Sequence, residues 1–164
     1  MDSAETVRLR PIDPDDALDV AEVLRINEEN VEVLAPMDEA KLRRKQAIAE
    51  RFDVIEVGGR IAGFVVVYAP TAGYWSENFA WFSGRYDDFL YLDRIALDPQ
   101  VRRLGVGSHV YAELEALAAP RGRMTLEAVD TNAGSLAFHA RRGYAEVGRL
   151  TVDGHPNVMM VKEL

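Results

Sequence analysis

The amino-acid sequence predicts a single mixed α/β domain that covers residues 1–164. Stretches in which apolar and polar residues alternate are interspersed with stretches whose apolar residues recur every three or four positions, as is typical of strands and helices. Apolar residues make up 48% of the chain, which is enough for a substantial core. No repeat, low-complexity tract or linker divides the chain. We therefore expect the order β-α-α-β-β-loop-β-α-β-α-β-β.

The first half of the chain carries a signal for each element. Alternation predicts a first strand, and Asp13-Pro14-Asp15-Asp16 then supplies a helix start with acidic residues near the positive end of the helix dipole. Gly58-Gly59 favours a tight hairpin. The elements expected in this half are, in order, a strand over Val7 to Ile12, helices over about Asp13 to Asn30 and Asp38 to Phe52, and strands over Asp53 to Val57 and Arg60 to Tyr68.

The second half opens with an aromatic-rich and glycine-rich segment, Pro70 to Asp88, which shows no period. We expect a loop there, and a loop of this length in a compact domain is often functional. Phe89 to Leu97 is apolar except for Asp93 and Arg94, which indicates a buried strand. The other expected elements are helices over Gly105 to Ala119 and Asn132 to Arg142, and strands over Met124 to Val129, Tyr144 to Val152 and Val158 to Lys162.

The charge and composition of the chain exclude several classes of function. Acidic residues outnumber basic ones by 27 to 19, a formal charge of −8, whereas nucleic-acid backbones are bound by clustered Lys and Arg. The longest apolar run, Ile61 to Pro70, is too short to span a bilayer, and the acidic N-terminus does not resemble a secretion signal. With no cysteine and three scattered histidines, we expect no disulfide and no metal site. We expect a cytoplasmic protein with no nucleic-acid or membrane partner.

Several charged or titratable side chains are interpreted as surface residues. The basic run Lys41-Leu42-Arg43-Arg44-Lys45 is expected to form a solvated helix face, and it is too short to indicate nucleic-acid binding. His109 and His155 are also expected on the surface.

The most informative stretch is the turn that follows the strand ending at Leu97. It reads Asp98-Pro-Gln-Val-Arg-Arg-Leu-Gly-Val-Gly-Ser108 and leads into a helix. Gly105 and Gly107 let a ligand approach the backbone closely, and unpaired N–H groups at a helix start favour an anion. Two arginines in the same turn add positive charge. The turn therefore predicts a cradle for a phosphate or pyrophosphate group.

Other interpretations of this turn can be weighed from the residues alone. The lysine-containing phosphate loop of many nucleotide hydrolases is absent. A dinucleotide-binding fingerprint would need a third glycine where Val110 stands, although Glu127 lies where a ribose-binding acid would be expected. An ordinary strand–turn–helix connection with a glycine cap is a further alternative.

The stretch Arg102-Arg-Leu-Gly-Val-Gly107 resembles the Arg/Gln-x-x-Gly-x-Gly/Ala signature of the Gcn5-related N-acetyltransferase (GNAT) superfamily. Downstream, Asn132, Phe138-His139 and Gly143-Tyr144 are similar in spacing to the Asn…Phe-Tyr…Gly-Phe segment of that family. The likeness is closest over about Phe89 to Gly148, and the segments Asn27 to Asn30 and Tyr74 to Phe82 resemble those of a poorly characterised subgroup of predicted acetyltransferases within the superfamily. It implies a mostly antiparallel sheet of six or seven strands, with helices on both faces and a cofactor cleft where the fourth and fifth strands splay apart.

The resemblance implies acetyl-CoA as the cofactor and assigns residues to it. The backbone at the end of the fourth strand would pair with the pantetheine arm, and the amides of the glycine-bearing turn would hold the pyrophosphate. Asn132 would hydrogen-bond the pantetheine region, and Phe138 would pack beside the cofactor. The implied cofactor-binding residues are Ile95, Ala96, Leu97, Arg102, Arg103, Leu104, Gly105, Val106, Gly107, Ser108, Asn132 and Phe138.

The implied reaction is a direct attack of an amine on a thioester, which needs a neutral amine, a donor to the carbonyl and a proton for the departing thiolate. We favour Asp93 as the base, acting through water, because it precedes Ile95 and Leu97 by two and four residues and so shares their side of the strand. Its alternative is an ion pair with an arginine, or a bulge that turns it away. A backbone N–H near Leu97 is the expected carbonyl donor.

His139 stands where most members of the family have a tyrosine. It follows Asn132 by seven residues, about two helical turns, so the two are expected to share a helix face. An imidazolium could protonate the thiolate near neutral pH, which makes His139 the candidate general acid. Alternatively, His139 only hydrogen-bonds the cofactor or a carboxylate, and the thiolate leaves without an acid.

Two segments are candidates for contacts with the acceptor. Tyr74 to Phe82 combines aromatic and polar residues in a way that suits a pocket wall, although Trp81 and Phe82 could equally fill the core. Asn27 to Asn30 falls where the resemblance implies an acceptor site, with a solvated helix end as the alternative. The expected substrate contacts are Asn27, Asn30, Tyr74, Ser76, Asn78 and Trp81.

These observations predict an acetyl-CoA-dependent N-acetyltransferase that acetylates a primary amine in a ternary complex and needs no metal. The acceptor would be a small amine or an exposed protein amine, and the net charge mildly favours a cationic one. One alternative is a non-catalytic acyl-CoA-binding or sensing domain, which Asp93 argues against and His139 leaves open. Another is a Rossmann-type oxidoreductase, which the missing third glycine opposes. The segment from Gly148 to Lys162 could supply an edge for a homodimer.

Overall fold

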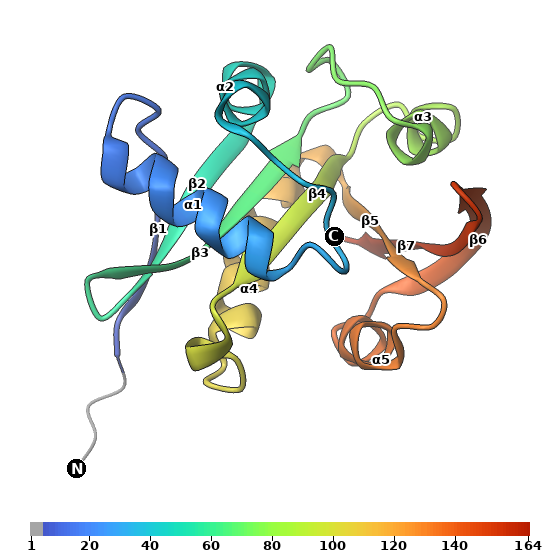
Figure 1. Cartoon of the computed structure of the whole chain (residues 1–164). Coiled ribbons are helices and arrows are strands. Elements are labelled where there is room, and N and C mark those ends of the chain that lie inside the picture. Colours follow the sequence, from blue (N-terminus) through green and yellow to red (C-terminus); the bar gives the residue numbers. More distant parts are fainter. Residues whose placement is uncertain (1–4) are drawn as a thin grey trace. The chain divides into compact units, whose positions relative to one another are not determined.

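A computed structural model describes residues 5–164 of the chain (Figure 1). Its strands follow the order β1-β2-β3-β4-β5-β7-β6 in a seven-stranded sheet that is mostly antiparallel, with β4 and β5 parallel. The strands are β1 (Val7–Pro11), β2 (Arg51–Val57), β3 (Arg60–Tyr68), β4 (Leu90–Leu97), β5 (Arg123–Val129), β6 (Ala145–Val152) and β7 (His155–Glu163). The helices are α1 (Ala17–Glu29), α2 (Glu39–Ile48), α3 (Glu77–Ser83), α4 (Val106–Ala118) and α5 (Ala133–Arg141). The predicted mixed α/β fold is confirmed.

The chain divides into two compact units. Unit 1 contains the residues up to Tyr68 together with Asp93–Leu114, and unit 2 contains Ala69–Leu92 together with Glu115–Leu164. Both β4 and α4 contribute residues to each unit. The sequence-predicted site residues are therefore distributed over two bodies.

Unit 1 is built on the antiparallel strands β1, β2 and β3, with α1 packed against β3 and α2 against β2. Helix α1 begins after Asp16, whose side chain accepts hydrogen bonds from two backbone N–H groups of the first turn. The cap is therefore Asp16, and Asp13 lies in the preceding turn, where its carbonyl accepts from the Asp16 N–H. The apolar core of this unit includes Val23, Ile26, Leu42, Val54, Ile55, Phe64, Val65 and Val66.

Helix α2 ends at Ile48, earlier than the sequence predicts. Ala49 already has an extended backbone, and Phe52 pairs with Val66 in the β2–β3 ladder. The expectation that the helix continues to Phe52 is wrong because Arg51 and Phe52 pair with Val67 and Val66, so the β2–β3 ladder extends beyond Asp53 toward the helix. A strand partner was available in the adjacent hairpin, and it fixes the extended conformation.

In unit 2, the segment predicted as a loop, Pro70 to Asp88, contains a helix. Ser76 caps α3 by accepting a hydrogen bond from the Phe79 N–H at 3.0 Å, and Gly84 ends the helix. Phe79 and Phe82, three residues apart, are the buried residues of this helix. The prediction of an uninterrupted loop is wrong. The many aromatic residues of this segment were interpreted as a pocket wall, and the signals of a short helix, an N-cap at Ser76 and a C-cap at Gly84, were not recognised.

The remainder of unit 2 is an antiparallel arrangement of β5, β7 and β6, and the start of β4 pairs in parallel with β5 at Leu90↔Met124 and Tyr91↔Thr125. β7 begins at His155, earlier than the expected Val158. Within residues 5–164, no helix combines the length and apolarity needed to cross a membrane.

Candidate functional site

The end of β4 presents alternating environments in unit 1. Arg94 and Ala96 are buried, whereas the whole residues Asp93, Ile95 and Leu97 are half-buried, although the side chain of Asp93 alone is only 7% exposed. This alternation is the one expected for a strand. It places Asp93 on the same side of β4 as Ile95 and Leu97, two of the three residues that the resemblance assigns to the pantetheine arm.

The turn after β4 is held at its start by Asp98. Its backbone N–H donates to the Ala62 carbonyl at 2.7 Å, and its carboxylate accepts from the Gln100 N–H at 3.0 Å and pairs with Arg25 at 3.3 Å. The hydrogen bond from the Gln100 amide, followed by that from Arg25, lowers the pKa of Asp98. The carboxylate is therefore ionised at neutral pH and fixes the start of the turn.

The turn then adopts an unusual backbone conformation. Arg103 has φ 72° and Gly105 has φ 78°, both in the left-handed region. A Cβ added to Gly105 would meet no atom within 4 Å, so the space beside this glycine is open. The first hydrogen bond of α4 runs from the His109 N–H to the Gly105 carbonyl at 3.2 Å. The backbone N–H groups that precede His109 in the first turn have no acceptor within the helix. Open space beside these amides suits an anionic group.

Arg102 fastens this turn to the end of α1. Its guanidinium donates to Asn30 Oδ1 at 2.7 Å and to the Leu97 carbonyl at 3.3 Å. Asn30 in turn donates through Nδ2 to the Ile26 carbonyl at 2.8 Å. A residue predicted to bind cofactor and one predicted to bind substrate are thus in direct contact, and both side chains hold the backbone of unit 1 in place.

Asp93 lies in a buried cluster of charges. Lys45 Nζ is 2.7 Å from Asp93 Oδ2, Arg94 Nε is 3.4 Å from the same oxygen, and each of the three side chains is only 7% exposed. The Tyr68 hydroxyl lies 3.5 Å from Lys45 Nζ. Burial lowers the pKa of Lys45, and the nearby Asp93 carboxylate opposes that effect. The expectation of a solvated basic run is wrong for Lys45, whereas Arg43 and Arg44 are exposed as expected.

Asn27, predicted to contact the substrate, is fully buried and belongs to the same network. Its Oδ1 accepts from Arg94 at 2.9 Å, and its Nδ2 donates to the Ala35 carbonyl at 3.1 Å. Arg94 donates to that carbonyl as well, at 3.1 Å. Asn27 therefore joins α1, β4 and the connection that leads to α2.

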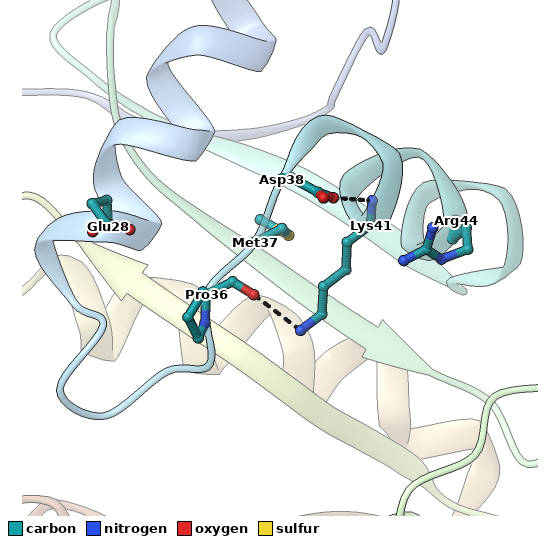
Figure 2. A pocket seen from close by; sticks show the side chains of 6 residues that line it. All are labelled: Glu28, Pro36, Met37, Asp38, Lys41 and Arg44. Carbon is teal, nitrogen blue, oxygen red and sulfur yellow. Dashed lines mark hydrogen bonds between the residues drawn. The ribbon is translucent and has the colours of Figure 1, made fainter.

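A pocket opens beside this connection (Figure 2). Lys41 Nζ donates to the Pro36 carbonyl at 3.1 Å, and the Asp38 carboxylate accepts from the Lys41 backbone N–H at 2.8 Å. Burial, together with the charge of Arg94, lowers the pKa of Lys41. The pocket thus presents both signs of charge near apolar surface. Its lining residues are Glu28, Pro36, Met37, Asp38, Lys41 and Arg44, none of which the sequence analysis assigned to a site.

In unit 2, the predicted cofactor and acid residues lie on α5. Asn132 caps this helix, its Oδ1 accepting from the Ser135 N–H at 3.1 Å, and Phe138 packs edge-on against His139. His139 is 5% exposed, and its Nδ1 lies 2.7 Å from the Ser135 carbonyl. Since a carbonyl only accepts, Nδ1 carries the proton and Nε2 of the neutral ring is an acceptor. Burial lowers the pKa of His139, so the ring is neutral at pH 7.

The aromatic segment of unit 2 divides into two groups. Trp81 packs so closely on β6 that a Cβ on Gly148 would come within 2.5 Å of its ring, and Ser76 serves as a helix cap. Tyr74 stacks on Tyr91 with ring centroids 6.4 Å apart. These contacts give Trp81 a packing role. Tyr74 lies against Tyr91, whose hydroxyl donates to Glu127.

From the sequence, Glu127 in unit 2 is considered only as a ribose-binding acid and is assigned no role in this site. Glu127 on β5 accepts from the Tyr91 hydroxyl at 2.8 Å and from Asn78 Nδ2 at 3.1 Å. Asn157 Nδ2 lies 3.5 Å from Asn78 Oδ1. An acidic residue inside an apolar strand was the available signal, the same signal that singled out Asp93. Asn78, which the sequence analysis predicts as a substrate contact, thus donates to this carboxylate.

Comparisons with known proteins identify the family. The sequence model described as "Acetyltransferase (GNAT) family" matches residues 19–144. None of the curated proteins compared matches the chain. Among solved structures, Ard1 from Thermoplasma volcanium has a TM-score of 0.74 at 20% identity, covering 96% of this chain and 97% of that one.

Two further structures are similar in fold. The ribosomal-protein-S18-alanine N-acetyltransferase from Escherichia coli has a TM-score of 0.67 at 18% identity, with 96% of this chain and 94% of that one covered. The protein yncA from Salmonella typhimurium, solved with its cofactor acetyl-CoA, has a TM-score of 0.69 at 17% identity, with 99% and 95% covered. The likeness supports the fold, and the family match covers well over half of the sequence. This chain belongs to the acetyltransferase (GNAT) family.

Proposed function

We propose that this protein is an acetyl-CoA-dependent N-acetyltransferase that transfers an acetyl group to a primary amine by direct attack in a ternary complex. Family membership supports acetyl transfer from an acyl-CoA in general. The observation that carries the finer statement is the turn after β4, with its left-handed Gly105 and open space at the start of α4.

The residues of this turn fit the diphosphate of acetyl-CoA. The amides at the start of α4 would hold the phosphate oxygens, and the exposed Arg103 would add positive charge. Arg102 is engaged with Asn30 and Leu97, so it supports the cradle by fixing its backbone. The backbone of Ile95, Ala96 and Leu97 would pair with the pantetheine arm.

Asp93 is the residue that we assign to proton acceptance. Bound acetyl-CoA would supply the thioester carbonyl that the amine attacks. Asp93 would take the proton that the acceptor nitrogen loses, through a water molecule, as the C–N bond forms and the C–S bond breaks. A positioned base of this kind contributes about 10²–10⁴-fold to the rate.

His139 is poorly suited to act as the general acid. Its one proton at neutral pH is donated to the Ser135 carbonyl, and burial disfavours the imidazolium that could protonate a thiolate. Nε2 can instead accept a hydrogen bond. We therefore propose that the thiolate leaves without protonation by His139.

The acceptor class is a primary amine on a small molecule or an exposed protein terminus. Ribosomal-protein-S18-alanine is the acceptor named for one similar structure, and a protein α-amine is one class to include in a panel. Tyr74 and Asn78 are proposed acceptor contacts because they lie at the Glu127 carboxylate of unit 2 or at its tyrosine partner. That carboxylate could attract an ammonium group.

Thiol release from acetyl-CoA in the presence of a panel of amines tests this proposal. The panel contains peptide α-amines, polyamines, aminoglycosides and amino acids, and products are identified by mass spectrometry. We expect at least one amine to be acetylated, and Asp93→Asn to lose turnover while keeping acetyl-CoA affinity. If Asp93→Asn turns over as fast as the unchanged protein, Asp93 is not the proton acceptor. Binding of acetyl-CoA without acetylation of any amine would favour an acyl-CoA-sensing domain.

A further inference from the structure

Lys45 is a buried member of the basic run that is interpreted from the sequence as a solvated helix face. It follows Arg43 and Arg44 on α2, yet its side chain is 7% exposed and theirs face solvent. Its ammonium reaches across to β4 and lies 2.7 Å from Asp93 Oδ2. Helix α2 therefore places the Lys45 ammonium in contact with Asp93, the residue that we assign to proton acceptance.

The surroundings of Lys45 are unfavourable for a buried ammonium. The charged groups that face it include Asp93 and Arg94 from β4 and Lys41 from its own helix, and the Tyr68 hydroxyl faces it from β3. Arg94 and Lys41 both disfavour the ammonium, whereas Asp93 favours it. Burying an ion pair of this kind contributes little net stability, since apolar residues of similar size often serve as well. Stability alone therefore gives a weak reason for a lysine at this position.

We propose that Lys45 is a positioning residue that orients the Asp93 carboxylate for proton acceptance. By donating to Oδ2, the ammonium fixes the direction of the carboxylate within the strand. This role rests on the proposed function, in which Asp93 takes the proton of the acceptor amine.

This role has a signature in the pH dependence of turnover. Desolvation lowers the pKa of Lys45, so its ammonium is lost at a lower pH than that of an ordinary lysine. Loss of that proton removes the charge that orients Asp93. Turnover at saturating substrates should therefore decline on the alkaline side at a pH below the ordinary lysine value. An arginine at this position stays charged throughout that range.

The test compares kcat against pH in the unchanged protein, Lys45→Arg and Lys45→Met. Lys45→Arg should keep at least a third of kcat and lose the alkaline decline. Lys45→Met should lose at least tenfold in kcat below the alkaline decline and approach the unchanged protein above it, with the affinity for acetyl-CoA unchanged by calorimetry. The matched control is Arg43→Met, which removes the same charge from an exposed position on α2 and should leave the profile unchanged.

Three results separate the possible failures. Lys45→Met within twofold of normal kcat at pH values below the alkaline decline overturns the positioning role. An alkaline decline that persists unchanged in Lys45→Arg overturns it as well, and this variant is informative even if Lys45→Met does not fold. Full turnover in Asp93→Asn instead overturns the assignment of Asp93, and with it the basis of the proposed function of this cluster.

Discussion

Replacement of Gly105 by alanine adds one methyl group to the proposed anion-binding turn and so tests whether that turn binds acetyl-CoA. Gly105 has φ 78°, and an alanine in the left-handed region costs about 1–2 kcal/mol. For a chain of this size, each kcal/mol lowers the Tm by about 2–4 °C. The added methyl group meets no protein atom within 4 Å, so strain is the only cost in the free protein.

The effect on acetyl-CoA binding should exceed this strain. The methyl group would occupy the open space in which we propose that the diphosphate binds against the first amides of α4. Losing one hydrogen bond to a charged group costs about 1.5–3 kcal/mol, so we expect the affinity to fall by about tenfold to a hundredfold. Calorimetric titration with acetyl-CoA measures the affinity, and thermal unfolding without ligand measures the strain.

Gly122→Ala is the matched control for this experiment. Gly122 has φ 88°, and its added Cβ also meets nothing within 4 Å, but it ends the turn before β5 in unit 2. We expect a similar loss of stability and an unchanged affinity. Normal affinity in Gly105→Ala would refute the cradle, and an equal loss of affinity in both variants would show that strain, and not the cradle, is responsible.

Three other predictions concern unit 2. Gly148→Ala should destabilise the protein by about 1–3 kcal/mol in urea unfolding, because the new Cβ would lie 2.5 Å from the Trp81 ring; a neutral result would contradict this packing. Glu115→Gln should cost about 1–3 kcal/mol, because Arg142 and Lys162, whose side chains are 20% and 25% exposed, lose the charge of their buried partner at 2.7 and 3.1 Å; an unchanged unfolding free energy would exclude that role. Burial lowers the pKa of His139 below 6.5, so the unfolded chain binds a proton more readily and stability should fall as pH drops below about 6.5. His139→Gln should lack this part of the pH dependence, and an unchanged slope would show that another group causes it.

The fold could be predicted from the sequence wherever local pattern and tertiary partner agree. The Gly58-Gly59 hairpin and β3 are examples, since the turn residues and the continuous apolar run both favour adjacent strands. The prediction failed at Phe52, where the hairpin partner decided between helix and strand. It also failed at α3, whose cap signal, Ser76 followed by buried residues at helical spacing, was masked by aromatic residues typical of a pocket wall.

The candidate site was predictable where its chemistry depends on a short segment. Gly105 and the arginines before it are contiguous, and the side of β4 that carries Asp93 follows from alternation. The burial of Lys45 was readable from its spacing, since it follows the buried Leu42 by three residues on α2, but its partner lies 48 residues further along the chain and could not be read from the local pattern. The neutral state of His139 depends on burial and on a carbonyl at 2.7 Å, and neither can be read from spacing.

The most direct test of the central claim is a calorimetric titration of the purified protein with acetyl-CoA, with NADH as the control ligand. We expect micromolar binding of acetyl-CoA, loss of that binding in Gly105→Glu, and no binding of NADH. Absence of binding to acetyl-CoA, to free CoA and to longer acyl-CoAs would contradict the proposed cradle after β4 and the acetyltransferase activity that depends on it.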